Sequence, residues 1–97
     1  MVQILSFCTN PTILPVMDRL VNKQEGWTGH RAADLRTAAA LVAEHDFDVV
    51  LLGAGTGDEE REALAAITKD KSTRYINHYG GGSGLLYAEV TEALQGN

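Results

Sequence analysis

The chain has 97 residues, the length of one domain, and 44% of them are apolar, an ordinary share for a globular protein. Its formal net charge of −5 argues against a nucleic acid or an acidic membrane as partner, because no basic face is available to replace counterions. The single cysteine excludes an internal disulfide, and the apolar runs are too short to span a bilayer. Because the amino terminus also lacks the pattern of a signal peptide, we expect a cytoplasmic protein.

The first two elements are a strand over residues 2–7 and an amphipathic helix that is followed by Gly26. Two starts fit this helix. Asn10 can cap it with Pro11 as its first residue, or Pro15 can be the first residue after a loop. The choice decides whether the segment after the first strand is helical or a roomy loop.

The rest of the chain continues the same alternation of strand and helix. The expected elements are a weak edge strand over 27–32, a helix over 35–45 capped by Asp34, a buried strand over 47–52, a helix opened by a capping box of Thr56 and Glu59, a strand over 73–78, and a helix over 85–95 capped by Ser83. Strict alternation predicts a parallel sheet with right-handed crossovers. We therefore expect one three-layer α/β domain over residues 1–97, with strand order 2-1-3-4 and helices on both faces of the sheet.

Two stretches carry a resemblance to a known family. Residues 4–11 contain the end of the first strand followed by Cys8, Thr9 and a proline, and residues 44–53 contain the apolar strand over 47–52 followed by Gly53. Both resemble the receiver domain of response regulators, which has a flavodoxin-like fold. The resemblance implies that Cys8 and Thr9 stand where a receiver has its magnesium-binding acidic pair, and that Gly53 stands where it has the aspartate that accepts phosphate. It implies a degenerate receiver, a pseudo-receiver, that acts as a protein-interaction or signalling module.

The chain is also similar to the IIB component of sugar phosphotransferase systems. That resemblance implies a phosphorylated cysteine at the end of the first strand, where Cys8 stands. The loop after Cys8 contains Pro11 and Pro15 and no glycine, although a phosphate cradle requires several backbone N–H donors. The two resemblances thus give a leading hypothesis, the interaction module, and an alternative, an anion-binding module or phosphocysteine carrier.

The candidate ligand site lies at the carboxyl edge of the sheet, where open α/β folds bind ligands. Its predicted residues are Cys8, Thr9, Asn10, Gly53, His78, Tyr79, Gly80, Gly81, Gly82 and Ser83. The glycine run fits an anion site at a helix start, but a simple turn is the favoured interpretation, as is Cys8 as a buried apolar residue. We predict no cofactor and no metal site, because the three histidines are scattered in the sequence.

The last strand leaves an edge of the sheet open, and open edges invite pairing. This edge and nearby aromatic residues predict an interface and a homodimer. The candidate interface residues are Tyr75, Asn77, Tyr79 and Tyr87. An enzyme is the least favoured class, because no nucleophile–base pair is visible. The alternative function requires an exposed Cys8 and a first helix that starts at Pro15, whereas the interaction module fits a buried Cys8 and a helix that starts at Pro11.

Overall fold

The computed structural model describes residues 2–53, 56–69, 71, 73–77 and 83–94. Strands and helices alternate along the chain. The elements are β1 (Val2–Phe7), α1 (Ile13–Asn22), β2 (Trp27–Ala32), α2 (Leu35–Glu44), β3 (Val49–Leu52), α3 (Asp58–Ile67), β4 (Arg74–Asn77) and α4 (Ser83–Leu94). In this part of the chain no helix is long and apolar enough to cross a membrane.

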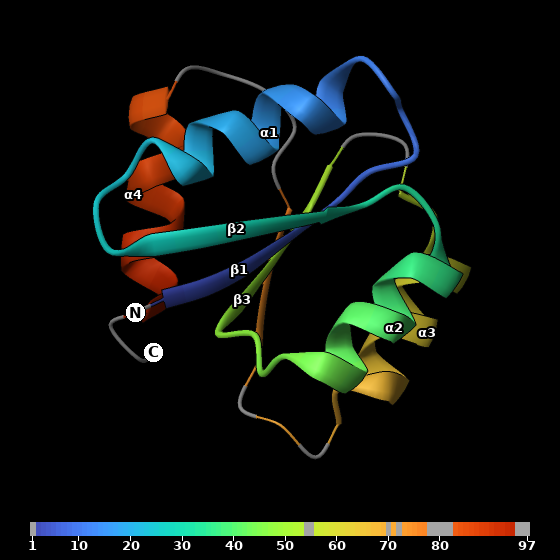
Figure 1. Cartoon of the computed structure of the whole chain (residues 1–97). Helices are drawn as coiled ribbons and strands as arrows, with labels where there is room; N and C mark the ends of the chain where they lie inside the picture. Colours follow the sequence, from blue (N-terminus) through green and yellow to red (C-terminus); the bar gives the residue numbers. More distant parts are fainter. Residues whose placement is uncertain (1, 54–55, 70, 72, 78–82, 95–97) are drawn as a thin grey trace.

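The four strands form one parallel sheet in the order β2-β1-β3-β4. In Figure 1, α1 and α4 cover one face of this sheet, and α2 and α3 cover the other. The predicted α/β flavodoxin-like fold, with its three layers and its strand order, is therefore confirmed. The central strands are β1 and β3, and the outer strands are β2 and β4.

Side chains of the central strands alternate between two apolar clusters, because successive residues of a strand point to opposite faces. Ile4 and Val49 pack under α1 and α4, whereas Leu5 and Val50 pack under α2 and α3. All four are fully buried. A strand that is covered on both faces has to be apolar almost throughout, which is why β3 consists of Val-Val-Leu-Leu.

The start of α1 is settled by Asn10. Its side-chain Oδ1 accepts hydrogen bonds from the N–H groups of Thr12 (2.8 Å) and Ile13 (3.3 Å). Asn10 therefore satisfies two backbone donors at the start of the helix. Both predicted starts are wrong by two residues, because Ile13 is the first residue of the helix and Thr12 occupies the capping position, whereas Pro11 lies in the turn before it and Pro15 lies inside the helix.

The predicted capping box of α3 is wrong by one residue. Gly57 occupies the capping position, and its N–H donates to Oε1 of Glu60 at 2.8 Å. The Thr56 hydroxyl instead donates to the carbonyl of Gly53 at 2.8 Å, so it closes the turn after β3. At the last helix, Ser83 is the first residue of α4 and not a cap that precedes it.

Candidate functional site

The carboxyl ends of β1 and β3 bring Cys8 and Gly53 together. The Gly53 N–H donates to the Phe7 carbonyl at 2.8 Å, which continues the ladder one residue beyond the strands. A Cβ atom at Gly53 would lie 2.7 Å from Sγ of Cys8, 2.8 Å from Cβ of Cys8 and 3.0 Å from Sδ of Met17. The space in front of Gly53 is thus already filled by two side chains of the core.

Cys8 lies in the core beneath this edge of the sheet. Its side chain is fully buried and belongs to the cluster under α1 and α4. Its Sγ accepts a hydrogen bond from the Asn10 N–H at 3.4 Å. The following residues, Thr9 and Asn10, are exposed, and the Asn10 side chain accepts from the backbone N–H groups of Thr12 and Ile13 at the start of α1. The expectation of an accessible thiol, on which the alternative function depends, does not agree with this burial.

The other half of the predicted ligand site lies outside the described residues. This applies to His78, Tyr79, Gly80, Gly81 and Gly82, so the anion site proposed for the glycine run stays a prediction. Ser83 begins α4. Of the predicted ligand-site residues, the structure therefore brings Cys8 and Gly53 together.

The candidate interface residues of the described part differ in their surroundings. The Tyr75 hydroxyl donates to the Leu64 carbonyl of α3 at 2.8 Å and also lies against the Thr68 hydroxyl. Burial raises the pKa of Tyr75. Its hydroxyl is therefore engaged within the chain, and a place for Tyr75 at an interface stays a prediction. Tyr79 lies outside the described residues.

Asn77 and Tyr87 agree better with an exposed surface. Asn77 is exposed at the end of β4, and Tyr87 on α4 is 46% exposed. The Tyr87 ring stacks on Trp27 with ring centroids 5.4 Å apart and an angle of 16° between the planes. This stack joins the start of β2 to α4.

A histidine pair at the opposite end of the sheet was missed by the sequence analysis. The rings of His30 on β2 and His45, which follows α2, have centroids 4.4 Å apart, and both rings contact Phe47. His30 Nε2 lies 3.1 Å from Oε1 of Gln3. Burial lowers the pKa of His30, the neighbouring His45 lowers it further, and Asp18 opposes them. In the sequence, only the alternation of side chains along the strand over 27–32, which places His30 on the face covered by α2, could have indicated this contact.

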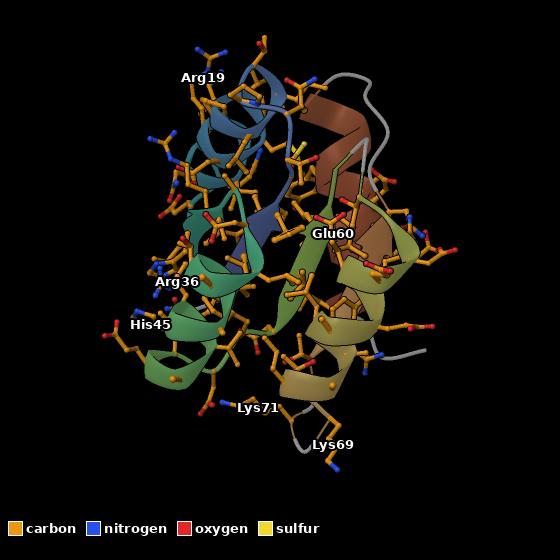
Figure 2. The ribbon with its side chains drawn as sticks, turned by 90° about the vertical axis from the view of Figure 1, so that its right-hand side faces the viewer. Arg19, Arg36, His45, Glu60, Lys69 and Lys71 are labelled. Atoms are coloured by element: carbon orange, nitrogen blue, oxygen red, sulfur yellow. The ribbon has the colours of Figure 1, made fainter. Side chains whose placement is uncertain are left out.

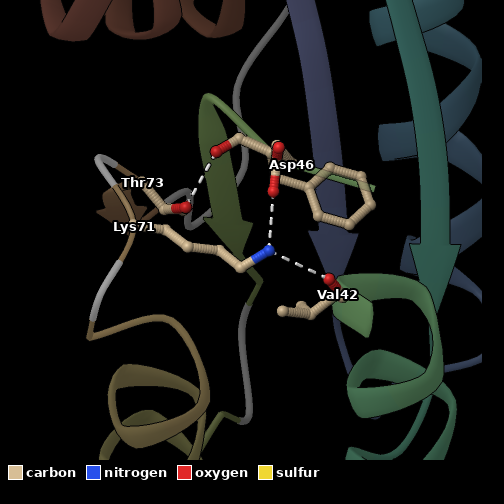
Figure 3. Close-up of polar contacts among 5 residues, drawn as sticks. Val42, Asp46, Lys71 and Thr73 are labelled. Carbon is tan, nitrogen blue, oxygen red and sulfur yellow. Dashed lines mark hydrogen bonds and ion pairs between the residues drawn. The ribbon is translucent and has the colours of Figure 1, made fainter. Parts of the chain in front are cut away.

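A second polar cluster at this end of the sheet connects the loop that enters β3 to the loop that enters β4 (Figure 3). Lys71 Nζ donates to Oδ1 of Asp46 at 2.7 Å and to the Val42 carbonyl at 3.2 Å, at the end of α2. The Thr73 hydroxyl donates to the Phe47 carbonyl at 2.8 Å. The hydrogen bond from Lys71 and its charge lower the pKa of Asp46. These bonds fix the loops that enter β3 and β4.

The described residues offer no ready metal site. No cluster of three or more His, Cys, Asp or Glu side chains in those ranges could hold a metal ion. The donors at the carboxyl ends of β1 and β3 are a buried thiol and exposed hydroxyl and amide groups, whereas magnesium prefers carboxylate oxygens.

Comparison with known proteins gives matches by structure alone. The chain matches a response regulator receiver domain protein from Clostridium thermocellum with a TM-score of 0.70 and 15% identity, covering 98% of this chain and 95% of that one. It matches the Vibrio cholerae chemotaxis protein CheY4 with a TM-score of 0.65 and 16% identity, covering 97% and 99%. It matches HP1043, an orphan response regulator of H. pylori, with a TM-score of 0.61 and 14% identity, covering 96% of each chain.

No protein-family model matches the sequence, and no curated protein matches it either. The chain therefore has the fold of response regulator receiver domains, over nearly its whole length. This confirms the receiver-like resemblance of the sequence at the level of fold.

Proposed function

We propose that this protein is a non-enzymatic, receiver-like protein-interaction module that does not accept phosphate at the position usual for receivers. The observation that carries the proposal is the close approach of Cys8 and Met17 to Gly53, at 2.7 to 3.0 Å from a Cβ atom there. An acceptor carboxylate needs room beyond its Cβ and an exposed oxygen. Here that room is occupied by two buried side chains, and the glycine itself is buried.

The donors around this position support the same proposal. Phosphoryl transfer relies on a magnesium ion and on groups that stabilise the charge of the transferred phosphoryl group. The side chains at the end of β1 are Cys8, Thr9 and Asn10, and none of them is a carboxylate. Asn10 is occupied by the first turn of α1. A phosphocysteine carrier is disfavoured by the complete burial of Cys8.

For the partner we propose a protein, a second copy of this chain included. The net charge of −5 disfavours a nucleic-acid partner, and a cytoplasmic location fits the sequence. The receiver fold is shared with CheY4 and with an orphan response regulator, and it fits a signalling role for this module.

The test is a phosphorylation assay on the folded protein. The chain is incubated with acetyl phosphate and Mg²⁺, and its intact mass is followed beside that of an active single-domain receiver. We expect no phosphate adduct under conditions that fully label the control. A stoichiometric adduct sensitive to hydroxylamine would refute the proposal in favour of an acyl phosphate, and an adduct mapped to Cys8 would refute it in favour of a phosphocysteine carrier.

A further inference from the structure

The two outer strands of the sheet, β2 and β4, differ in whether the backbone groups on their outer edges have partners. In a parallel pair, alternate residues direct their N–H and C=O groups toward the neighbouring strand. The Val2 N–H donates to the Gly26 carbonyl at 2.9 Å, which fixes the alternation in the pairing of β1 with β2. The backbone groups of Trp27, Gly29 and Arg31 therefore point away from the sheet.

The outward donors of β2 are largely satisfied by the end of α1. The Trp27 N–H donates to the Gln24 carbonyl at 3.2 Å. The Gly29 N–H donates to Oδ1 of Asn22 at 2.8 Å. The Asn22 side chain packs directly on the strand, because a Cβ atom at Gly29 would lie 2.8 Å from its Nδ2. The first two outward positions of the β2 edge, Trp27 and Gly29, are thus closed to pairing with another strand by the protein's own residues.

The β4 edge has no such cover from the described residues. The Arg74 N–H donates to the Asp48 carbonyl at 3.0 Å, so Arg74 and Ile76 direct their backbone groups toward β3. Tyr75 and Asn77 direct theirs outward. Within the described part of the chain, no hydrogen bond reaches these outward groups. An open row of this kind is a template for a further strand.

We propose that β4 pairs in antiparallel orientation with β4 of a second copy, with Ile76 on the two-fold axis. This inference rests on the proposed function and names its partner. In this register the outward N–H of Asn77 donates to the Tyr75 carbonyl of the second copy, and the Tyr75 N–H donates to the Asn77 carbonyl. The two-fold axis repeats both bonds. All the outward groups of Tyr75 and Asn77 are then satisfied, and the two sheets join into one of eight strands.

The charged side chains near β4 favour the same antiparallel arrangement of the two copies. Figure 2 shows Glu60 near one end of α3 and Lys69 beyond its other end. Lys69 and Arg74 are exposed at the end where β4 begins. The opposite end carries the exposed acidic side chains Asp58, Glu59 and Glu62. A two-fold axis through Ile76 reverses the second copy, so that each cationic end faces an anionic end, whereas a parallel arrangement would oppose like charges.

The experiment compares two proline variants by sedimentation equilibrium over a range of protein concentrations. Asn77→Pro removes an outward N–H of β4 without removing a bond to β3, and edge strands tolerate proline at such positions. Arg31→Pro makes the same change at an outward N–H of the β2 edge. We expect the wild type to dimerise, Asn77→Pro to weaken the dimer at least about ten-fold because symmetry removes two of four bonds, and Arg31→Pro to leave it unchanged.

A second measurement requires no variant and covers the case in which Asn77→Pro fails to fold. Amide hydrogen exchange of Tyr75 and Asn77 is expected to slow as the protein concentration rises, while that of Arg31 stays constant. Exchange at Tyr75 and Asn77 that is independent of concentration overturns the proposal, and so does a wild type that stays monomeric or a dimer that Asn77→Pro leaves intact. None of these results touches the proposed absence of phosphate uptake, which the phosphorylation assay tests separately.

Discussion

Replacing Gly53 by alanine tests whether the space at the end of β3 is as closed as the distances indicate. The added Cβ would lie 2.7 and 2.8 Å from two atoms of Cys8, closer than atoms in van der Waals contact, and Cys8 is fully buried. Overpacking of a core typically costs about 1–3 kcal/mol. Alanine also restricts the unfolded chain, which returns about 0.4–1 kcal/mol. We therefore expect Gly53→Ala to lower the free energy of unfolding by about 1–2 kcal/mol, measured by urea denaturation.

A double-mutant cycle assigns this loss to the contact with Cys8. Cys8→Ala removes the sulfur but keeps its Cβ, so the double variant should be more stable than the sum of the single effects by at least about 0.5 kcal/mol. The matched control is Gly57→Ala, whose Cβ would meet only Oε1 of Glu60 at 3.3 Å, the end of a flexible side chain. Gly57→Ala should be additive with Cys8→Ala. A stability of Gly53→Ala within about 0.5 kcal/mol of the wild type, or an additive cycle with Cys8→Ala, would refute the reasoning.

Three further predictions concern groups outside this contact. The buried Ser6 hydroxyl has no hydrogen-bond partner among the residues that the structure describes, so Ser6→Ala should leave the free energy of unfolding unchanged or raise it by up to about 1 kcal/mol, and a lower free energy of unfolding would contradict this. The pKa of His30 is lowered in the folded state, so the unfolded chain binds more protons as the pH falls below 6.5, and stability should decline there. His45→Gln should raise the His30 pKa in an NMR titration, and an unchanged value would contradict the coupling. The pKa of Asp46 is also lowered, so its hydrogen bond to Lys71 should stabilise the fold at pH values above the ordinary pKa of an aspartate. The difference in free energy of unfolding between wild type and Asp46→Asn should therefore vanish as the pH is lowered through that range.

The strand order and the alternation of strands and helices could be predicted from the sequence, but most element ends differ by one or two residues: β3 begins at Val49 and not at residue 47, and β4 covers Arg74–Asn77 and not 73–78. The run over 27–32 became β2 with the predicted bounds, and Asp34 caps α2 by accepting from the Thr37 N–H at 2.7 Å. The cap of α3 was misplaced by one residue because Gly57 has no side chain to signal it. Its partner Glu60 supplies the carboxylate instead.

The contacts that matter for function could not be predicted in the same way. The filled space at Gly53 depends on the side-chain positions of Cys8 and Met17, which come from other elements of the fold. Tyr75 was predicted to be at an interface from the open edge of its strand and its aromatic ring, but the sequence alone does not show that its hydroxyl reaches α3. His30 and His45 are separated in the sequence and meet only because an edge strand and the end of a helix converge.

The stack of Trp27 on Tyr87 has a spectroscopic consequence. Trp27 is the only tryptophan of the chain, so all of the indole emission comes from one place, the contact between the start of β2 and α4. The chromophore therefore reports on the seating of the last helix against a strand from the first third of the chain. A shift of its emission maximum on addition of a binding partner would locate the disturbance at α4 without any label.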